Sequence, residues 1–453
     1  MKILIAGAGK VGRALTEELA DEGHDITLID MNGRVLEDAM EKYDVITIQG
    51  NSASKKVLEE ADVGAMDLFI AATNADEVNL LACLTAHTVN PDIHTIARIR
   101  NPEYVEQAYQ MRNVFSLSLV INPERQAALE IARLLKYPGF LKRESFAKVR
   151  VEIVELKVMH GSRLVDVQLS KLENTVRAKV LVCAVLRNGK PYMPDGSFVL
   201  KEGDRIFVTG QPEELHSMLT HIGIINLPVS NVFITGGGRI TYYLAEELDK
   251  AAIHSTILEI DQAKCESLSA SLPRATIIQG DASDHGVLES EDISEYDAMV
   301  SLTGLDELNI VTSMYAHLSN VHQIVTKLGR GESSELIDSL PIGSTICPKE
   351  LCMMYIVRYV RAMQSKEGAA LTIHRIADGN AEAIEFLVDK DTRHIGEKFK
   401  NIRIKKNILI CSVGRGMHTE IPNGDSSFKV GDTVIIITSH DMVVHQLNDI
   451  FED

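Results

Sequence analysis

Short apolar runs alternate with stretches of helical periodicity along the first part of the chain. Residues 3–12 read Ile-Leu-Ile-Ala-Gly-Ala-Gly-Lys-Val-Gly, an apolar run that leads into a glycine-rich turn. The turn is followed by an apolar stripe at i, i+3, i+4 and i+8, formed by Val11, Ala14, Leu15 and Leu19. This spacing predicts a buried strand and then an amphipathic helix that ends before Gly23.

Further apolar runs recur at residues 45–48, 68–72 and 93–97, with helix-like segments between them. The motif Asn122-Pro123-Glu124 opens another predicted helix, expected from Gln126 to Tyr137 and closed by Pro138-Gly139. This βαβ rhythm predicts a parallel sheet covered on both faces, that is, a Rossmann-type doubly wound domain.

The pattern changes after residue 140. Strand-like runs at Val149–Val154, Val180–Val185 and Arg205–Val208 are punctuated by Asn188-Gly189, Pro194-Asp195-Gly196 and Glu202-Gly203-Asp204. Such closely spaced turn signals indicate a smaller α+β domain. A short helix, Glu213 to Ile222, is expected to close it, and Pro228 marks a linker.

The second half repeats both patterns. Residues 232–241 read Val-Phe-Ile-Thr-Gly-Gly-Gly-Arg-Ile-Thr, and Gly236 lies 229 residues after Gly7. Later motifs keep nearly the same offset, as Thr73 and Asn79 match Thr303 and Asn309. The sequence therefore predicts a tandem duplication of a two-domain module, with domains at 1–138, 139–225, 229–365 and 366–453.

The first glycine turn carries a dinucleotide-binding signature. Gly7-Ala8-Gly9-Lys10-Val11-Gly12 follows a strand and opens a helix, and Asp30 ends the next apolar run. The first glycine makes the tight turn, the second lets main-chain N–H groups approach a pyrophosphate, and the third allows close helix–strand packing. Asp30 would accept the ribose hydroxyls and repel a 2′-phosphate, which favours NAD-type or unphosphorylated adenosine ligands over NADP. The alternative is a turn whose glycines serve packing only.

The second turn, Gly236-Gly237-Gly238-Arg239-Ile240-Thr241, replaces the third glycine by Thr241, and Glu259 stands in the place of Asp30. A side chain at Thr241 should push the helix away from the strand by a small amount. We expect a nucleotide here too, with a degenerate structural copy as the alternative.

Cations occupy matching places at the end of another strand. Arg98 follows the run Thr95–Ala97, and Lys327 is its counterpart. Either can meet a ligand phosphate or a neighbouring carboxylate, or it can be a solvated surface charge. Thr73-Asn74 is expected to line the crevice near the adenosine, although polar loop residues without a ligand role are common. The full set of expected nucleotide-binding residues is Gly7, Ala8, Gly9, Lys10, Val11, Gly12, Asp30, Asn51, Thr73, Asn74, Arg98, Gly236, Gly237, Gly238, Arg239, Ile240, Glu259, Asp281, Thr303 and Lys327.

Composition narrows the partners. The 453 residues carry a formal net charge of −18, so binding to nucleic acid or to anionic lipid is disfavoured. No apolar stretch approaches the roughly 20 residues that span a bilayer, and no secretory signal is present, which indicates a cytosolic protein. The six cysteines form no Cys-x-x-Cys pair and are expected to be reduced, and no metal site is expected.

Catalytic arrangements do not repeat between the halves. A dehydrogenase needs a substrate domain with a proton donor near the nicotinamide, and the small units at 149–222 and 372–450 are short and rich in turns. We therefore expect a nucleotide sensor and no enzyme. An NAD-dependent oxidoreductase with a duplicated cofactor domain is the main alternative, and a purely structural scaffold is the other.

The duplicated arrangement resembles the tandem RCK (KTN) family of TrkA-type regulators of bacterial potassium uptake, over essentially the whole chain. The resemblance rests on the two glycine turns with Asp30 and Glu259, on Gly50-Asn51 and Gly280-Asp281, on Thr73-Asn74, and on Ala97-Arg98 and Lys327. In the small domains it rests on Pro194-Asp195-Gly196 with Gly203-Asp204, and on Pro422-Asn423-Gly424 with Gly431-Asp432.

This resemblance implies a cytoplasmic, homo-oligomeric ring of RCK domains, a dimer or tetramer, attached to the inner face of the membrane through a potassium-translocating subunit of the Trk or Ktr type. It also implies that NAD(H) and ATP or ADP compete for the crevices and shift the geometry of the ring, without direct lipid insertion.

Overall fold

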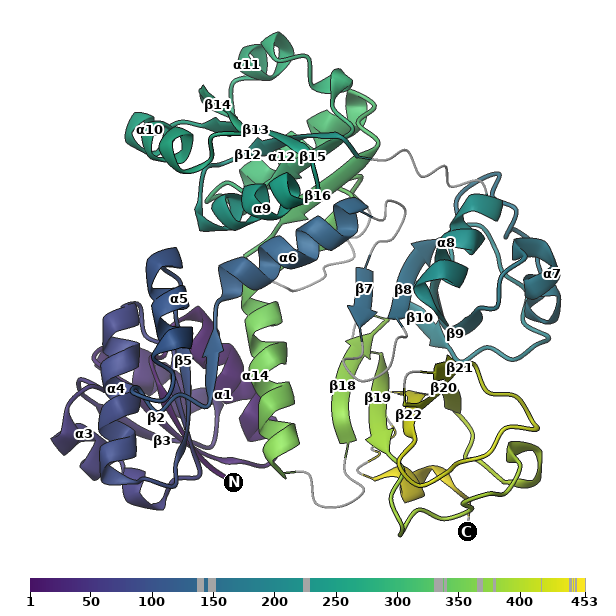
Figure 1. Cartoon of the computed structure of the whole chain (residues 1–453), viewed down its shortest axis with the longest axis horizontal. Coiled ribbons are helices and arrows are strands. Elements are labelled where there is room, and N and C mark those ends of the chain that lie inside the picture. Colours follow the sequence, from purple (N-terminus) through teal and green to yellow (C-terminus); the bar gives the residue numbers. More distant parts are fainter. Residues whose placement is uncertain are drawn as a thin grey trace. The chain divides into compact units, whose positions relative to one another are not determined.

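The computed structural model describes residues 1–136, 142–145, 152–222, 229–329, 337, 340–364, 370–377, 380–416, 418–439, 442, 444 and 446–452. The chain folds into two compact units. One combines Met1–Ala132 with Ser230–Val357, and the other combines Arg133–Val229 with Arg358–Asp453. Each unit therefore contains one domain from each half of the sequence (Figure 1).

The first parallel sheet has the strand order β3-β2-β1-β4-β5-β6. Its strands are β1 (Lys2–Ala6), β2 (Asp25–Asp30), β3 (Ile46–Gln49), β4 (Leu68–Ala71), β5 (His94–Arg98) and β6 (Leu119–Ile121). The helices are α1 (Lys10–Asp21), α2 (Gly33–Lys42), α3 (Lys55–Glu60), α4 (Asp76–Val89), α5 (Pro102–Gln110) and α6 (Pro123–Lys136). The order reverses between β1 and β4, and in open α/β sheets ligands bind in the crevice at the carboxyl ends of the strands beside such a reversal.

The second parallel sheet repeats this order as β14-β13-β12-β15-β16-β17. Its strands are β12 (Asn231–Thr235), β13 (His254–Glu259), β14 (Thr276–Gln279), β15 (Ala298–Ser301), β16 (Gln323–Lys327) and β17 (Ser344–Ile346). The helices are α9 (Arg239–Lys250), α10 (Gln262–Ser271), α11 (His285–Ser290), α12 (Asp306–Leu318) and α14 (Pro348–Gln364). The predicted pair of Rossmann-type sheets is thus confirmed.

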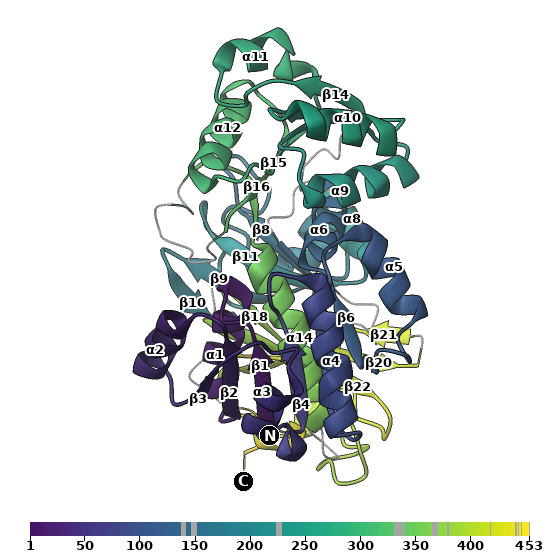
Figure 2. The ribbon, with the colours of Figure 1, turned by 90° about the vertical axis from the view of Figure 1, so that its left-hand side faces the viewer.

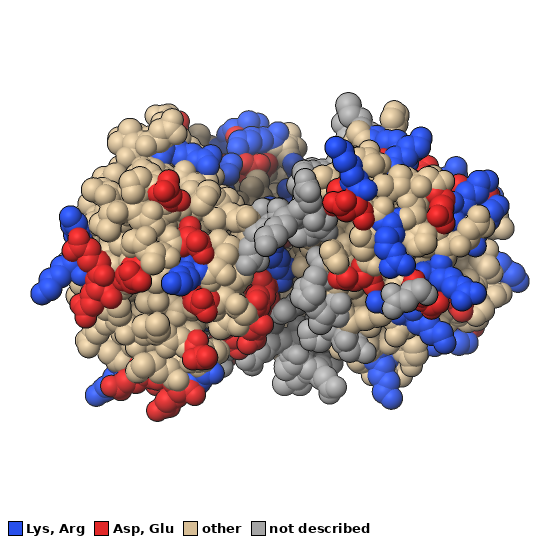
Figure 3. Space-filling model, turned by 90° about the horizontal axis from the view of Figure 1, so that it is seen from below, with Lys and Arg blue, Asp and Glu red and all other residues tan. Residues whose placement is uncertain are grey.

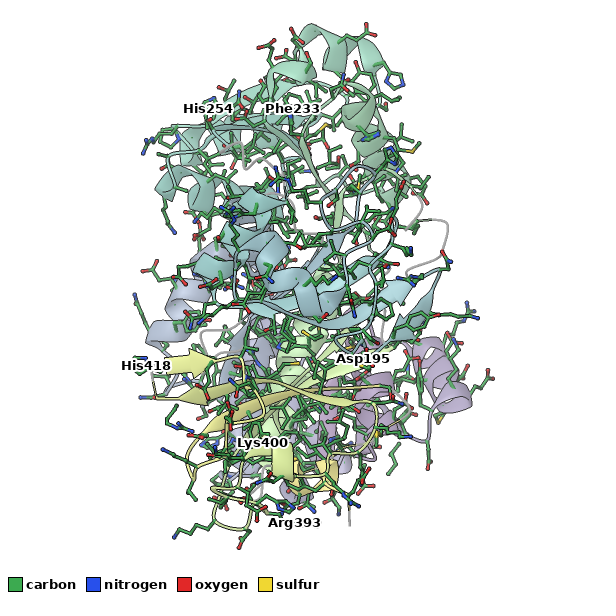
Figure 4. The ribbon with its side chains drawn as sticks, turned by 90° about the vertical axis from the view of Figure 1, so that its right-hand side faces the viewer. Asp195, Phe233, His254, Arg393, Lys400 and His418 are labelled. Atoms are coloured by element: carbon green, nitrogen blue, oxygen red, sulfur yellow. The ribbon has the colours of Figure 1, made fainter. Side chains whose placement is uncertain are left out.

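Buried apolar strands explain why both sheets form. All four residues of β4 and of β15 are buried, as expected for strands covered by helices on both faces. Phe233 of β12, labelled in Figure 4, is fully buried and packs edge-to-face against Tyr296. His254 begins the neighbouring strand β13, where its exposed side chain contacts the Thr276 hydroxyl.

The two small domains are built on antiparallel sheets, with orders β10-β9-β11-β8-β7 and β18-β19-β22-β20-β21. The first contains β7 (Lys142–Ser145), β8 (Glu152–Lys157), β9 (Leu181–Arg187), β10 (Lys190–Tyr192), β11 (Arg205–Gly210), α7 (Leu172–Val176) and α8 (Pro212–His221). The second contains β18 (Ala370–Ile376), β19 (Ala381–Leu387), β20 (Ile408–Arg415), β21 (His418–Glu420) and β22 (Thr433–Ser439). The predicted small α+β domains are confirmed by these sheets.

Each small domain contains an Arg–Asp ion pair at the equivalent position. Arg187 pairs with Asp204 at 2.7 Å, and Arg415 pairs with Asp432 at 2.7 Å. The two sheets also share one apolar cluster, which includes Cys183 and Cys411. Burial and the neighbouring Cys183 thiol raise the pKa of Cys411 well above its usual value. All six cysteines are free thiols, as the sequence predicts.

Several predicted boundaries move. Helix α6 begins at Pro123, one turn before the expected Gln126, because the Asn122 side chain accepts a hydrogen bond from Arg125 N at 2.8 Å and caps the helix. Strand β8 begins at Glu152 and continues to Lys157, beyond the expected end at Val154. Tyr137, Pro138-Gly139, residues 149–151 and the predicted linker residue Pro228 lie outside the described residues.

Two sequence signals for ends and turns hold well. Asn188 and Gly189 both have positive φ values, of 52° and 73°, as a two-residue hairpin turn between β9 and β10 requires. Helix α8 runs from Pro212 to His221, one residue away from the expected bounds.

Lys400, labelled in Figure 4, belongs to the second small domain. Its ammonium group pairs with the Asp425 carboxylate at 2.7 Å.

Candidate functional site: twin crevices beside the glycine turns

Each crevice begins with a glycine that no other residue could replace. Gly7 has a φ of +98°, and a Cβ there would lie 2.9 Å from Ala72 O, at the end of β4. Gly236 has a φ of +95° and would meet Leu302 O at the same distance. Positive φ and close contact with the neighbouring strand both exclude a side chain. The turn of each module therefore lies directly against the loop that follows β4 or β15.

The third position of the motif differs between the modules. A Cβ on Gly12 would lie 1.8 Å from Gly7 O, which no packing adjustment tolerates. In the second module, Thr241 is fully buried and its hydroxyl donates to Gly236 O at 2.5 Å. The second turn thus accommodates a side chain at this position, and the threonine hydroxyl is hydrogen-bonded to the turn.

The helices that follow the turns start at glycines. Gly9 and Gly238 are the N-cap residues of α1 and α9, and neither end has a side-chain cap. The N–H groups of the first helical turn, from Lys10-Val11 and Arg239-Ile240 onward, carry the positive end of the helix dipole. This arrangement suits a phosphate.

An acidic side chain lies beside each turn. The Asp30 carboxylate accepts hydrogen bonds from Ala8 N at 2.7 Å and from Asn32 N at 2.8 Å. Since a carboxylate has about four lone-pair positions, two acceptor positions remain for ribose hydroxyls. The carboxylate thus lies against the glycine turn, and its predicted contact with ribose hydroxyls stays a prediction.

Glu259 makes the equivalent contacts, with Gly237 N at 2.6 Å and Asp261 N at 3.0 Å. It is only 6% exposed, whereas Asp30 is half-buried. Its longer side chain fills the turn, because a Cβ on Gly237 would lie 2.6 Å from Leu268 Cδ1 and 3.0 Å from Glu259 Oε2. Glu259 is therefore more enclosed by its turn than Asp30 is.

Arg98 and Lys327 hold the loops that follow β4 and β15, and these two loops are called the walls below. Arg98 is 8% exposed and donates to Thr73 O at 2.7 Å, and Lys327 donates to Thr303 O. Burial lowers the pKa of Arg98, and the nearby Arg100 lowers it further. The alternative interpretation as a solvated surface charge is wrong for Arg98, which is buried. Lys327 is half-buried, and burial is the largest cause that lowers its pKa.

Charges around Lys327 act in both directions on its pKa. After burial, which lowers this pKa, the Asp306 carboxylate has the next largest effect and raises it, and the positive charge of Lys10 lowers it by a smaller amount.

One asparagine in each module was not recognised as a site residue. Asn79 is fully buried, and its Oδ1 accepts from Thr73 N at 2.9 Å and from Thr73 Oγ1 at 2.7 Å. Its Nδ2 donates to Arg98 O at 2.8 Å. Asn309 repeats all of these contacts with Thr303 and Lys327. The asparagine thus ties the ends of two strands together and fixes the position of the wall. The recurrence of Thr-x5-Asn in both halves was the signal.

The side chains of Asn51 and Asp281 form hydrogen bonds within their own turns. The Asn51 side chain accepts from Ala53 N at 3.0 Å, and Asp281 accepts from Ser283 N at 2.8 Å. Both side chains are exposed and close their own turns, and the hydrogen bonds from Ser283 lower the pKa of Asp281. They follow β3 and β14, so they share the sheet edge with the glycine turns, and their role stays a prediction.

Chemical features for other functions are sparse. Among the described residues, no cluster of three or more His, Cys, Asp or Glu side chains could hold a metal ion. Within the same part of the chain, no helix has the length and apolarity needed to cross a membrane. Basic and acidic side chains are interspersed on the face drawn in Figure 3, which shows no continuous basic surface there.

Comparison with known proteins identifies the modules. The TrkA-N domain family matches residues 3–123 and 232–348, which contain the two glycine turns. The TrkA-C domain family matches residues 153–223 and 383–451, in the two small domains.

Curated relatives match over the full length. The chain is 31% identical over 458 residues to the Trk system potassium uptake protein TrkA of Haemophilus influenzae, covering 100% of this chain and 99% of the relative. It is 31% identical over 452 residues to the Trk system potassium uptake protein TrkA homolog of Archaeoglobus fulgidus, with 100% of both chains covered.

Solved structures share the fold. The GsuK RCK domain superimposes with a TM-score of 0.63 at 17% identity, covering 97% of this chain and 92% of that one. The GsuK channel bound to NAD gives a TM-score of 0.62 at 17% identity, covering 97% and 77%. Taken with the duplicated domains and the full-length relatives, these matches show that the chain belongs to the TrkA family of Trk potassium uptake proteins.

Proposed function

We propose that the chain is a regulatory subunit of a Trk-type potassium uptake system, and that it senses nucleotides in its two crevices. The observation that carries this proposal is an arrangement that occurs in both modules and is called the cradle here. A carboxylate, Asp30 or Glu259, accepts a hydrogen bond from the N–H group of Ala8 or Gly237. The helix that begins beside it has no side-chain cap. The chemistry of the cradle suits the ribose and pyrophosphate of an adenine nucleotide.

NAD(H) is the expected ligand of the first crevice, with ATP or ADP as competitors. The acidic Asp30 would repel the 2′-phosphate of NADP. Two related structures carry names that support nucleotide binding in this fold, the GsuK channel bound to NAD and GsuK bound to ADP. The predicted site residues of both glycine turns, with Thr73-Asn74, Thr303, Arg98 and Lys327, are proposed to surround these ligands.

The protein acts, on this proposal, without catalysis. A nucleotide that binds one conformation of the module better than another shifts the population toward it. That shift would pass to a potassium-translocating membrane subunit, to which a homo-oligomer of this chain attaches at the cytoplasmic face. The four-domain division at 1–138, 139–225, 229–365 and 366–453 belongs to the same proposal.

A thermal-shift panel tests nucleotide sensing first. NAD, NADH, ATP and ADP should each raise the melting temperature of the purified chain in proportion to the logarithm of ligand concentration above Kd. NADP, as the matched control, should give a smaller shift than NAD. The absence of any shift with all four nucleotides would contradict the proposal and favour a structural scaffold.

Flux measurements test the regulatory role. Vesicles that contain a Trk-type membrane subunit should take up potassium at a rate that depends on added nucleotide only when this chain is present. A nucleotide-independent rate would contradict the proposal. A substrate-dependent change in NADH absorbance with the purified chain alone would instead support the oxidoreductase.

A further inference from the structure

One buried tyrosine joins the two Rossmann-type domains. Tyr243 of α9 is 6% exposed, and its hydroxyl accepts a hydrogen bond from Asn122 Nδ2 at 2.9 Å and donates to Arg100 O at 3.3 Å. Asn122 follows β6 and is 5% exposed. We propose that this Tyr243–Asn122–Arg100 bridge couples nucleotide occupancy in the two crevices, an inference that rests on the proposed function.

One end of the bridge starts at the second glycine turn. Helix α9 begins at Arg239, and Tyr243 lies one turn further along the same helix. The hydrogen bond from Tyr242 N to Gly238 O, at 3.1 Å, ties this turn of helix directly to the glycine loop. A phosphate that draws the first helical turn toward itself therefore displaces the Tyr243 hydroxyl as well, because the helix moves as a stiff element.

The other end reaches the wall of the first crevice. Arg100 N donates to the Asp76 carboxylate at 2.8 Å, and the Arg100 guanidinium donates to Asn74 O. Asn74 follows Thr73, whose carbonyl oxygen holds Arg98. The carbonyl that Tyr243 contacts thus belongs to the segment that positions the predicted ligand residues Thr73, Asn74 and Arg98.

The bridge exists in one direction only. The first module has Ala14 at the position that corresponds to Tyr243, 229 residues earlier, and Cys347 at the position that corresponds to Asn122, before Pro348. An alanine methyl group cannot make the reciprocal hydrogen bond. The duplication therefore supplies no second copy of this bridge, which links the second glycine helix to the segment around Arg100.

The hydroxyl remains a donor at physiological pH. Burial raises the pKa of Tyr243 to about 12, with the nearby Glu124 charge acting in the same direction and the hydrogen bond from Asn122 acting against it. Neutral tyrosine can donate to Arg100 O and accept from Asn122 at the same time. Replacing it with phenylalanine removes both bonds and keeps the ring that packs beside Tyr242.

Calorimetric titration with ADP tests the bridge in the full chain. Gly9→Ala should block the first crevice and Gly238→Ala the second, so that each variant gives the ADP affinity of the crevice that stays open. From these two single-site affinities we calculate the titration expected for a wild-type chain whose sites are independent. In the wild type we expect a departure from independence of about 5-fold or more, the usual range of allosteric coupling. Tyr243→Phe should bring this coupling factor close to 1 while leaving the single-site affinities unchanged.

Tyr242→Phe is the matched control, because the Tyr242 hydroxyl contacts Glu246 of its own helix at 3.1 Å. It should keep the wild-type coupling factor. Asn122→Ala removes one of the two hydrogen bonds of the Tyr243 hydroxyl and should also lower the coupling factor, and adding it to Tyr243→Phe should change the coupling no further. Asn122→Ala also keeps the test valid if Tyr243→Phe does not fold.

Three results would overturn the inference. These are a wild-type coupling factor of 1, unchanged coupling in both Tyr243→Phe and Asn122→Ala, and an equal loss in Tyr242→Phe. A wild-type chain that gives no binding heat with ADP or NAD would instead overturn the proposed function itself, and the bridge would lose its role with it.

Discussion

The two crevices share one plan but differ in how much room they leave. In the first, Gly12 allows the tightest approach of helix to strand, and Asp30 stays half-buried. In the second, Thr241 occupies the helix–strand contact and the longer Glu259 lies inside the turn at 6% exposure. Gly237 replaces Ala8 because the Glu259 and Leu268 side chains take the space of a methyl group. Each change in the second copy is thus compensated by another nearby.

This difference indicates that duplication preserved the cradle while the ligand preference was free to change. The first crevice offers a more accessible carboxylate and an arginine, and the second offers a buried carboxylate and a lysine. We therefore expect the first to bind NAD more tightly and the second to depend more on phosphate charge.

The largest effect should come from Gly9→Ala. A Cβ at Gly9 meets no protein atom within 4 Å, so the fold should be unaffected, but the methyl group would occupy the approach of the pyrophosphate. Calorimetry should show the loss of one nucleotide equivalent per chain at an unchanged melting temperature. Gly12→Ala, whose methyl would collide with Gly7 O, should lose both binding and thermal stability. Full binding by Gly9→Ala would refute a phosphate position at this turn.

Asp30→Ala should follow in size. Losing charge-assisted hydrogen bonds to the ribose should weaken NAD binding by about 1–3 kcal/mol. It should also narrow the preference for NAD over NADP, because the repulsion of the 2′-phosphate disappears. Glu259→Ala is the paired variant, and there thermal stability should fall more, since the buried Gly237 N loses its acceptor. Equal NAD affinity in wild type and Asp30→Ala would rule out the ribose contact.

Thr241→Ala tests the compensation inside the second turn. It removes the hydroxyl that donates to Gly236 O and should lower the free energy of unfolding by about 0.5–1.5 kcal/mol. Scanning calorimetry should resolve this as a small decrease in melting temperature. Thr16→Ala provides the comparison in the first module, where Thr16 donates to Gly12 O at 2.8 Å. An increase in stability on losing the Thr241 hydroxyl would contradict the proposed compensation.

The smallest expected effect is a change in the protonation of Lys327 with pH and with ADP binding. Because burial lowers the pKa of Lys327, the folded chain binds fewer protons there than the unfolded chain, so stability should rise with pH between the lowered pKa and the usual lysine value. Phosphate binding favours the charged ammonium. ADP binding to the second crevice at alkaline pH should therefore take up a fraction of a proton.

Calorimetry in buffers of different ionisation enthalpy measures this uptake. It should vanish in Lys327→Arg and should be absent at the first crevice, because the arginine at position 98 stays charged. Uptake that persists in Lys327→Arg would assign the proton to another group.

Local sequence signals predicted both glycine turns, the carboxylates that follow them and the two parallel sheets, because strict spacing leaves little choice at Gly7, Gly12 and Asp30. They missed Asn79, whose role depends on contacts with two strands that only the folded chain brings together. They left Arg98 undecided between ligand and solvent, since burial by a distant helix is not encoded nearby. Cys352 of α14, from the second half, is one of the groups that act on the pKa of Arg98.

Tyr243 illustrates the same limit. As part of the amphipathic stripe of α9 it is an ordinary core residue in the sequence, and its partners Asn122 and Arg100 are more than 100 positions away. Aligning the two copies gives no signal for Tyr243 either, because the equivalent position in the first module is an alanine. Asymmetry between copies therefore has to be found in the contacts between them.

The stoichiometry of ADP binding by isothermal calorimetry tests the central claim most directly. We predict two equivalents per wild-type chain, falling to one in Gly9→Ala and to none when Gly238→Ala is added. Two equivalents retained in the double variant, or none in the wild type, would contradict a pair of nucleotide-holding crevices.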